Sequence, residues 1–222
     1  MNYLAVIGDV IDSKSLENRY DVQNNFKACL QAINEKYKEE IVSKFSLTLG
    51  DEFQGLLSAQ VNIFQVIDDI ILLMKPYQIR FGIGLGQILT DINPDVSIGA
   101  DGPAYWNARQ AINYIHEKND YGQNHLAFQS DNKLTSKVIN SLLAAGEAIK
   151  NNWVTSQQEV FETMLSENIY AEDFNQALLA KEMKLDPSAL SKRLKSSSIK
   201  VYFRTRLTAC DLYQQGLEEE TK

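Results

Sequence analysis

The sequence predicts an α+β protein in two parts: a domain of strands and helices over residues 1–130, and a mostly helical domain over residues 131–222. Three observations support this division. Short apolar or alternating runs, typical of strands, are interleaved with longer segments of helical spacing up to about residue 130. Beyond that residue no strand-like run follows. Residues 176–196 then have the core spacing and the turn of a helix-turn-helix.

The first half of the α+β domain is predicted to be a strand, a helix and a hairpin. Residues 3–8 form an apolar run typical of a buried strand. Residues 16–41 carry apolar side chains at helical spacing. Alternation over residues 45–49 and a second run over residues 53–57 flank a Gly-Asp-Glu turn, so the two runs predict a hairpin.

The second half adds a helix, a strand, a helix and a strand. Residues 61–74 are strongly apolar at helical spacing and precede a proline, which predicts a buried helix. A strand over residues 79–89, a helix over 103–116 and a short strand over 125–129 follow. The order is β-α-β-β-α-β and then α-β, which is the ferredoxin-like arrangement with an added unit.

Glycines recur at alternate positions of the strand predicted over residues 79–89, at Gly82, Gly84 and Gly86. A glycine face on a strand indicates that another backbone or a ligand approaches closely. The sequence leaves both alternatives open, a bound ligand and a helix packed tightly on the strand.

The second domain is predicted to be helical throughout. Apolar spacing indicates helices over residues 134–149, 153–165, 174–183, 188–194 and 201–217.

Composition is that of an ordinary globular protein, with 44% hydrophobic and 23% charged residues in 222. No apolar run reaches the ~18 residues of a membrane span, and the N-terminus has no features of a signal peptide. We therefore expect a cytoplasmic protein that does not enter the membrane.

Charge is unevenly distributed along the chain. The net charge is −7, yet residues 178–207 hold eight basic and two acidic residues, a net charge of +6. A basic island on an acidic protein is consistent with a phosphate-bearing partner. A solvated helix face is the alternative.

Two carboxylates are predicted to meet at one edge of the sheet. Asp9 ends the first strand, and Asp51 lies in the turn before the third strand, its antiparallel neighbour. Two adjacent carboxylates repel unless a cation or strong donors balance them, and Mg²⁺ prefers one or two carboxylates with phosphate oxygens. The alternative is that Asp51 only makes the turn and Asp9 only caps the next segment. Asp12 and Glu52 are neighbouring acids that could substitute.

Four runs, taken in order, resemble the nucleotide cyclase fold of class III adenylyl and guanylyl cyclases and of diguanylate cyclases. They are AVIGDVIDS, SLTLGDEFQGLL, IRFGIGLGQILT and SIGADGPAYWNARQAI. The whole chain is identified as a member of the SatD family, a bacterial group that pairs such a domain with a C-terminal helix-turn-helix. The resemblance implies metal ligands at Asp9 and Asp51, nucleotide contacts from Gly50, Glu52, Arg80 and Arg109, and a purine nucleotide as ligand.

Two departures from the cyclase pattern weaken the case for catalysis. Leu47 occupies the position of the purine-selecting lysine, and Tyr105 that of the asparagine that steadies the transition state. Arg109 remains as the candidate catalytic residue. Loss of transition-state donors costs orders of magnitude in rate, whereas a domain that only binds a nucleotide tolerates it.

The helix-turn-helix predicted at about residues 176–196 has a small residue where its helices cross, Ala180. A helix of this kind presents its outer face to DNA. The residues expected to contact duplex DNA are Lys181, Ser188, Ser191, Lys192 and Lys195. The alternative is a helical hairpin that packs on the first domain or on a second subunit.

The sequence therefore favours a regulatory protein, a DNA-binding transcription regulator whose degenerate cyclase-like domain responds to a nucleotide or metal. The first alternative is an enzyme, a divergent Mg²⁺-dependent nucleotidyl cyclase or phosphotransferase. The second is an inert cyclase-like scaffold for protein contacts. Because helix-turn-helix proteins commonly read paired half-sites, we also expect a homodimer.

Overall fold

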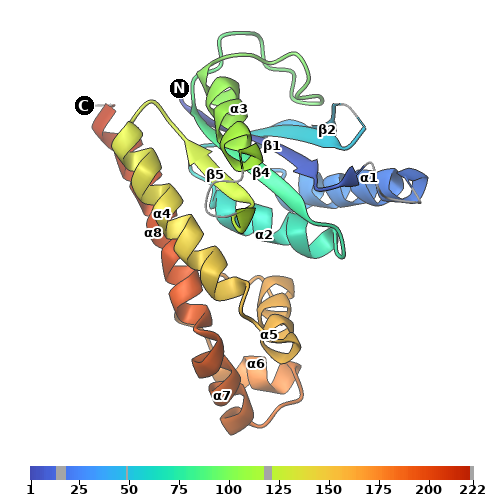
Figure 1. Ribbon diagram of the computed structural model, residues 1–222, viewed down its shortest axis with the longest axis vertical. Coiled ribbons are helices and arrows are strands. Elements are labelled where there is room, and N and C mark those ends of the chain that lie inside the picture. The colour runs from blue at the N-terminus through green and yellow to red at the C-terminus, as the bar shows by residue number, and fades with distance from the viewer. Residues whose placement is uncertain (14–18, 49, 118–121, 221–222) are drawn as a thin grey trace.

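The computed structural model describes residues 1–13, 19–48, 50–117 and 122–220, and Figure 1 shows its elements. The start of the helix predicted from residue 16 and residue 49 of the predicted hairpin lie outside the described residues. None of the described helices is both long enough and apolar enough to cross a membrane.

A five-stranded sheet forms the centre of the first part of the chain, in the order β2-β3-β1-β4-β5. All neighbouring strands are antiparallel except β4 and β5. The predicted β-α-β-β-α-β order with an added α-β unit is confirmed, and the order of β1 to β4 is the ferredoxin-like one. The elements are β1 (Tyr3–Val10), α1 (Arg19–Lys36), β2 (Ile41–Leu47), β3 (Glu52–Ser58), α2 (Ile63–Leu73), β4 (Ile79–Gly86), α3 (Pro103–His116) and β5 (Leu126–Gln129).

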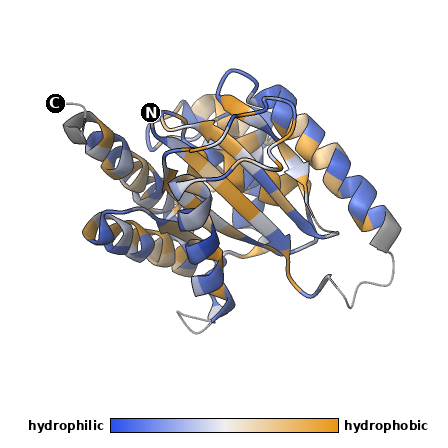
Figure 2. Ribbon diagram, turned by 90° about the horizontal axis from the view of Figure 1, so that it is seen from above, coloured by the Kyte–Doolittle hydropathy of each residue, from blue (hydrophilic) through white to orange (hydrophobic). Residues whose placement is uncertain are grey.

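Helices cover both faces of the sheet because its strands are apolar on both sides. Alternate residues of β1 divide between two hydrophobic clusters. Leu4 and Val6 pack with α1 and α2, and Ala5 and Ile7 pack with α3. Figure 2 shows the apolar strands enclosed between helices that are polar on their outer sides.

The glycines of β4 allow α3 to lie directly on the strand. A Cβ at Gly82 or Gly84 would overlap backbone atoms of Ala104 or Ala108 on α3, and one at Gly86 would crowd the first turn of that helix. The alternative of a helix packed on the strand is therefore correct for these glycines. This close packing fixes where α3 holds its polar side chains.

The second part of the chain is helical, as expected from its sequence, with α4 and α8 side by side along the edge of the molecule (Figure 1). The three shorter helices gather at the end of this pair that lies farther from the sheet. The helices are α4 (Lys133–Lys150), α5 (Thr155–Ser166), α6 (Gln176–Glu182), α7 (Pro187–Ser197) and α8 (Ile199–Glu220).

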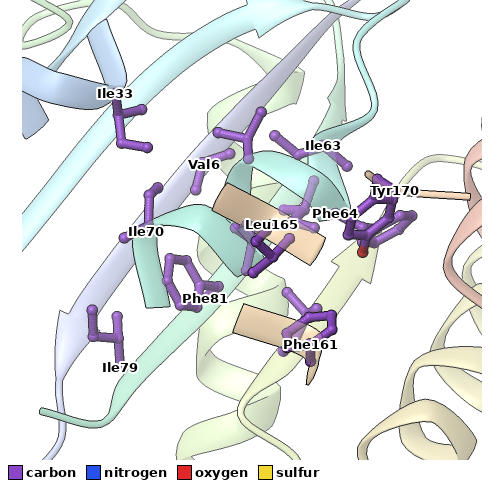
Figure 3. Packing of buried hydrophobic residues seen from close by; sticks show 14 of the residues in the cluster. Val6, Ile33, Ile63, Phe64, Ile70, Ile79, Phe81, Phe161, Leu165 and Tyr170 are labelled. Carbon is purple, nitrogen blue, oxygen red and sulfur yellow. The ribbon is translucent and has the colours of Figure 1, made fainter. Parts of the chain in front are cut away.

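One hydrophobic cluster extends from the sheet into the helical part. It contains Phe64 and Ile70 of α2 together with Phe161 and Leu165 of α5, whose side chains appear close together in Figure 3. A buried polar group joins the same parts, because Asp68 of α2 receives hydrogen bonds from tail residues. The change from strands to helices near residue 130 is thus not a break in the core.

Candidate functional site

Three charged residues lie side by side across one end of the sheet. In the register of the strands, Asp9 on β1 is opposite Glu52 on β3 and opposite Arg80 on β4. These residues share the sheet face that α3 covers, because Ile7, two residues before Asp9, packs against that helix. Arg80 Nε donates to Asp9 Oδ1 at 2.8 Å.

Helix α3 adds two basic side chains above this row. Arg109 and His116 are seven residues apart and therefore project from one side of the helix. Arg109 donates to both carboxylate oxygens of Glu52, at 2.7 and 3.0 Å. His116 Nε2 lies 2.9 Å from Asp9 Oδ2, and its Nδ1 lies 3.1 Å from a guanidinium nitrogen of Arg80.

These contacts fix the hydrogen-bonding roles of the group. A guanidinium only donates, so His116 Nδ1 accepts from Arg80 and its Nε2–H donates to Asp9. The hydrogen bonds from Arg109 hold the pKa of Glu52 below its ordinary value, and the same pair raises the pKa of Arg109. Together the five side chains form a compact, nearly balanced charge cluster, which we call the sheet-end cluster: Asp9, Glu52, Arg80, Arg109 and His116.

Asp51 is the predicted partner of Asp9. Its backbone lies next to the end of β1, but its carboxylate bonds to a residue other than Asp9. The backbone oxygen of Asp51 accepts from Val10 N at 3.3 Å, which places the end of β1 against the turn before β3, as predicted. The carboxylate of Asp51 accepts from the Ser13 hydroxyl instead. Gly50 makes the turn with a φ of +62°, a conformation that suits glycine.

In this arrangement the carboxylates of the sheet-end cluster are bonded to protein donors rather than grouped around a metal position. Both oxygens of Asp9 accept hydrogen bonds from basic side chains, so a metal ion at Asp9 would compete with Arg80 and His116. In the part of the chain that the structure describes, no three Asp, Glu, His or Cys side chains are grouped to hold a metal ion. Binding of Mg²⁺ at Asp9 and Asp51 therefore stays a prediction, and it requires Asp9 to exchange its partners.

A second candidate surface lies on α6 and α7. The two helices are joined by a tight turn in which Leu185 N bonds to Ala180 O at 2.9 Å and Lys184 N to Lys181 O at 3.1 Å. This is the pattern of a Schellman motif, with Lys184 in the left-handed conformation that glycine usually adopts. Leu179, Ala180, Leu190 and Leu194 are buried. The five residues predicted to contact DNA are all exposed: Lys181, Ser188, Ser191, Lys192 and Lys195.

Only half of the basic island is available to a partner. Four of its eight basic residues form ion pairs within the molecule, and these pairs are Arg193–Glu159, Lys200–Asp173, Arg204–Glu172 and Arg206–Glu147. Among the described residues no acidic partner lies within ion-pair distance of the other four, Lys181, Lys184, Lys192 and Lys195. The available positive charge is thus concentrated on α6, α7 and the turn between them.

Comparison with known protein families assigns the chain to one of them. The family model described as "SatD family" matches residues 3–213, which is nearly the entire sequence. The chain belongs to the SatD family. No curated protein matches it in sequence.

Two solved structures are similar to part of this SatD family chain. Both are described as a bacterial light-regulated adenylyl cyclase, with TM-scores of 0.41 and sequence identities of 15% and 17%. Each similarity covers 58% of this chain and 43% of the cyclase chain, so the SatD family chain matches less than half the length of those proteins.

His116 is the member of the sheet-end cluster that sequence reasoning missed. Two histidines are too few for a zinc site, and a histidine on a helix is more often a polar surface residue, so composition does not single out His116. The signal that would have found it is its spacing from Arg109. A helix that places Arg109 over the sheet end places a residue two turns later on the same side.

Proposed function

We propose that this SatD family chain is a DNA-binding regulatory protein, and that its first domain, cyclase-like in sequence pattern, binds a nucleotide without converting it. The single observation that carries the DNA-binding part is the exposed outer face of α7. Lys192 and Lys195 project from it beside two serines, with Lys181 nearby on α6.

The physical argument rests on the phosphates of DNA. Exposed lysines without acidic partners neutralise phosphates and release condensed counterions, which supplies most non-specific affinity. The serine hydroxyls of Ser188 and Ser191 add hydrogen bonds to phosphate or base edges. Ala180 of α6 is buried and the two helices are joined by the tight turn, so α7 presents this face as a rigid unit.

The nucleotide-binding part is supported by the sheet-end cluster. The side chain of Arg109 is 47% exposed and that of Arg80 is 23% exposed, and both are held by carboxylates whose hydrogen bonds a polyphosphate can replace. Gly50, in the turn before β3, leaves room for a ligand because, apart from its chain neighbours, no heavy atom of the described residues lies within 4 Å of the position of a Cβ. A purine nucleotide with Mg²⁺ is the ligand that we propose for this site.

The proposed lack of catalysis is supported by the two departures from the cyclase pattern, Leu47 and Tyr105. Tyr105 of α3 is buried among apolar residues of the sheet, and its side chain supplies no amide donor in place of the asparagine. Arg109 is itself held by Glu52. A site with one transition-state donor, already engaged, is better suited to binding than to phosphoryl chemistry.

The test is a binding titration of the full chain with a library of genomic duplex fragments at several salt concentrations. Binding that weakens steeply as salt rises supports the proposal, because phosphate neutralisation has that signature. No binding at low salt would contradict it. The expected homodimer is checked on the same sample by light scattering at micromolar concentration.

The second candidate is a Mg²⁺-dependent nucleotidyl cyclase or phosphotransferase. The backbone contact between the ends of β1 and the hairpin turn, which brings Asp9 and Asp51 into neighbouring positions, favours it. Formation of a cyclic mononucleotide or dinucleotide from ATP or GTP by the full chain would support this candidate over the regulator. If the chain binds neither nucleotide nor DNA, the inert scaffold remains.

A further inference from the structure

A cavity of about 270 Å³ lies where the first domain meets the helical tail, between α2, the end of α4 and α5. Its apolar walls are Ile71 and Leu72 of α2, Trp153, and Phe161 and Leu165 of α5. Apolar walls with a few polar groups at one end are the usual construction of a small-molecule site. The volume is near the lower end of such sites and is too small for a nucleotide, so this cavity is separate in kind from the sheet-end cluster.

The polar end of the cavity contains Asp68 and Lys150, whose side chains are 2.7 Å apart. Asp68 is fully occupied: its two oxygens accept from Lys150, from the Tyr170 hydroxyl at 2.7 Å and from the Tyr202 hydroxyl at 2.7 and 2.9 Å. A carboxylate with these donors has no capacity left for a cationic ligand.

Lys150, in contrast, has hydrogen-bonding capacity left for a ligand. An ammonium group has three N–H donors, and the one hydrogen bond that Lys150 Nζ makes within the described residues is to Asp68. Its side chain is 18% exposed and lines the cavity. Burial would lower the pKa of Lys150, but the adjacent Asp68 carboxylate outweighs it and raises that pKa, so the ammonium is charged at neutral pH. At the mouth, Lys75 and Glu162 pair with each other and add no net charge.

We propose that this cavity is a binding site for a small carboxylate with an aromatic or branched apolar body. The carboxylate accepts hydrogen bonds from Lys150, and the apolar body lies between Trp153, Phe161 and Leu72. Because the walls come from α2 and from the tail helices, an occupied cavity stabilises the contact between the two parts of the chain.

The test uses phenylacetate as probe and phenylacetamide, its neutral analogue of nearly equal shape, as the comparison. Calorimetric titration of the full chain is expected to give saturable binding of phenylacetate, with phenylacetamide at least ~10-fold weaker, a difference of about 1.4 kcal/mol. In a Trp106→Phe protein, Trp153 is the remaining tryptophan, and its fluorescence is expected to change along the same curve.

Two adjacent residues of α2 provide matched variants. Leu72→Trp fills the cavity without touching the Asp68 contacts, and it is expected to abolish binding. Leu73→Trp, the same change at an exposed position that does not line the cavity, is expected to leave binding unchanged.

The role of Lys150 in binding the carboxylate is tested by the double variant Asp68→Asn with Lys150→Gln. This variant replaces the buried ion pair by two neutral side chains that can still hydrogen-bond to each other. It is expected to bind phenylacetate and phenylacetamide equally. Circular dichroism establishes that each variant is folded. The proposal is overturned if phenylacetate shows no saturable binding up to about 10 mM, if the amide binds as tightly as the acid to the unaltered chain, or if Leu72→Trp binds as well as Leu73→Trp.

Discussion

Asp9 on β1 and Arg80 on β4 form an ion pair at 2.8 Å, in directly opposite positions of neighbouring strands. Their side chains are 13% and 23% exposed, so the pair is shielded from water. The negative charge of Asp9 is therefore balanced by a protein cation, with His116 on its second oxygen. Repulsion between Asp9 and Asp51, expected from their predicted proximity, is not the main feature of this site.

Removal of Asp9 is expected to destabilise the fold more than removal of Asp51. Asp9→Ala leaves the shielded Arg80 without its partner, which costs ~1–3 kcal/mol in the free energy of unfolding. Asp51→Ala removes a carboxylate bonded to the Ser13 hydroxyl in a partly buried turn, and we expect a loss under ~1 kcal/mol. Urea denaturation of both variants measures the difference. Equal losses would show that Asp9 is not held as described.

Nucleotide binding is expected to raise the thermal midpoint of the full chain, because a ligand that binds the folded state alone stabilises it. We expect ATP or GTP to do so with Mg²⁺, and Arg80→Gln and Arg109→Gln to remove the effect. Asp9→Asn and Asp51→Asn should remove the part that depends on Mg²⁺. The reaction mixtures should contain no cyclic mononucleotide or dinucleotide. Product that disappears in both aspartate variants would instead support the enzyme.

The pair of Glu52 and Arg109 predicts a specific pH dependence of stability. Because the hydrogen bonds from Arg109 lower the pKa of Glu52 in the folded state, the pair stabilises the fold above the ordinary carboxyl pKa of about 4.3. That stabilisation is lost as pH falls through the lower folded-state pKa. Half of Arg109 is exposed, so we expect only ~0.5–1 kcal/mol.

Glu52→Gln is the variant that measures this effect. It should be less stable than the unaltered chain at pH 7 and should approach it as the pH falls below the lowered pKa of Glu52. Denaturant titrations across this range give the difference at each pH. A deficit that stays constant down to the lowest pH would contradict an ionic role for the pair.

The turn between α6 and α7 predicts a stabilising substitution. Lys184 has a φ of +53°, where an L-residue is strained and glycine is not. Lys184→Gly should raise the free energy of unfolding by ~0.5–1 kcal/mol. Lys195→Gly, within α7, removes the same charge and should lower it by about 1 kcal/mol. Thermal denaturation compares the two, and the same sign for both would argue against the left-handed turn.

The sequence predicted the sheet well because its signals are local. The apolar run before Asp9 and the alternation across the hairpin reflect contacts with the helices on both faces. The spacing of Leu179, Leu190 and Leu194 likewise marked the buried side of α6 and α7. Local periodicity does not determine how α4 and α8 lie against each other or against β5, because that packing depends on residues far apart in sequence.

The available charge of the basic island could not be predicted, because it too depends on contacts between residues far apart in sequence. The basic island contains eight basic residues. The acidic residues that neutralise half of them lie outside the island in sequence, and the pair of Glu172 with Arg204 is an example. His116 joined the sheet-end cluster only because the glycines of β4 bring α3 close to the strand. A spacing pattern within α3 does not reveal which residues of β1 it faces.

The most direct test of the proposed function is the affinity of charge-reversed variants for duplex DNA, followed by fluorescence anisotropy over a range of salt. Lys192→Glu with Lys195→Glu reverses two charges on α7, and Lys133→Glu with Lys137→Glu makes the same change on the exposed side of α4. We expect the α7 pair to abolish binding, and the α4 pair to retain it with an unchanged dependence on salt. Equal binding by both double variants would contradict the assignment of α7 as the DNA-contacting helix.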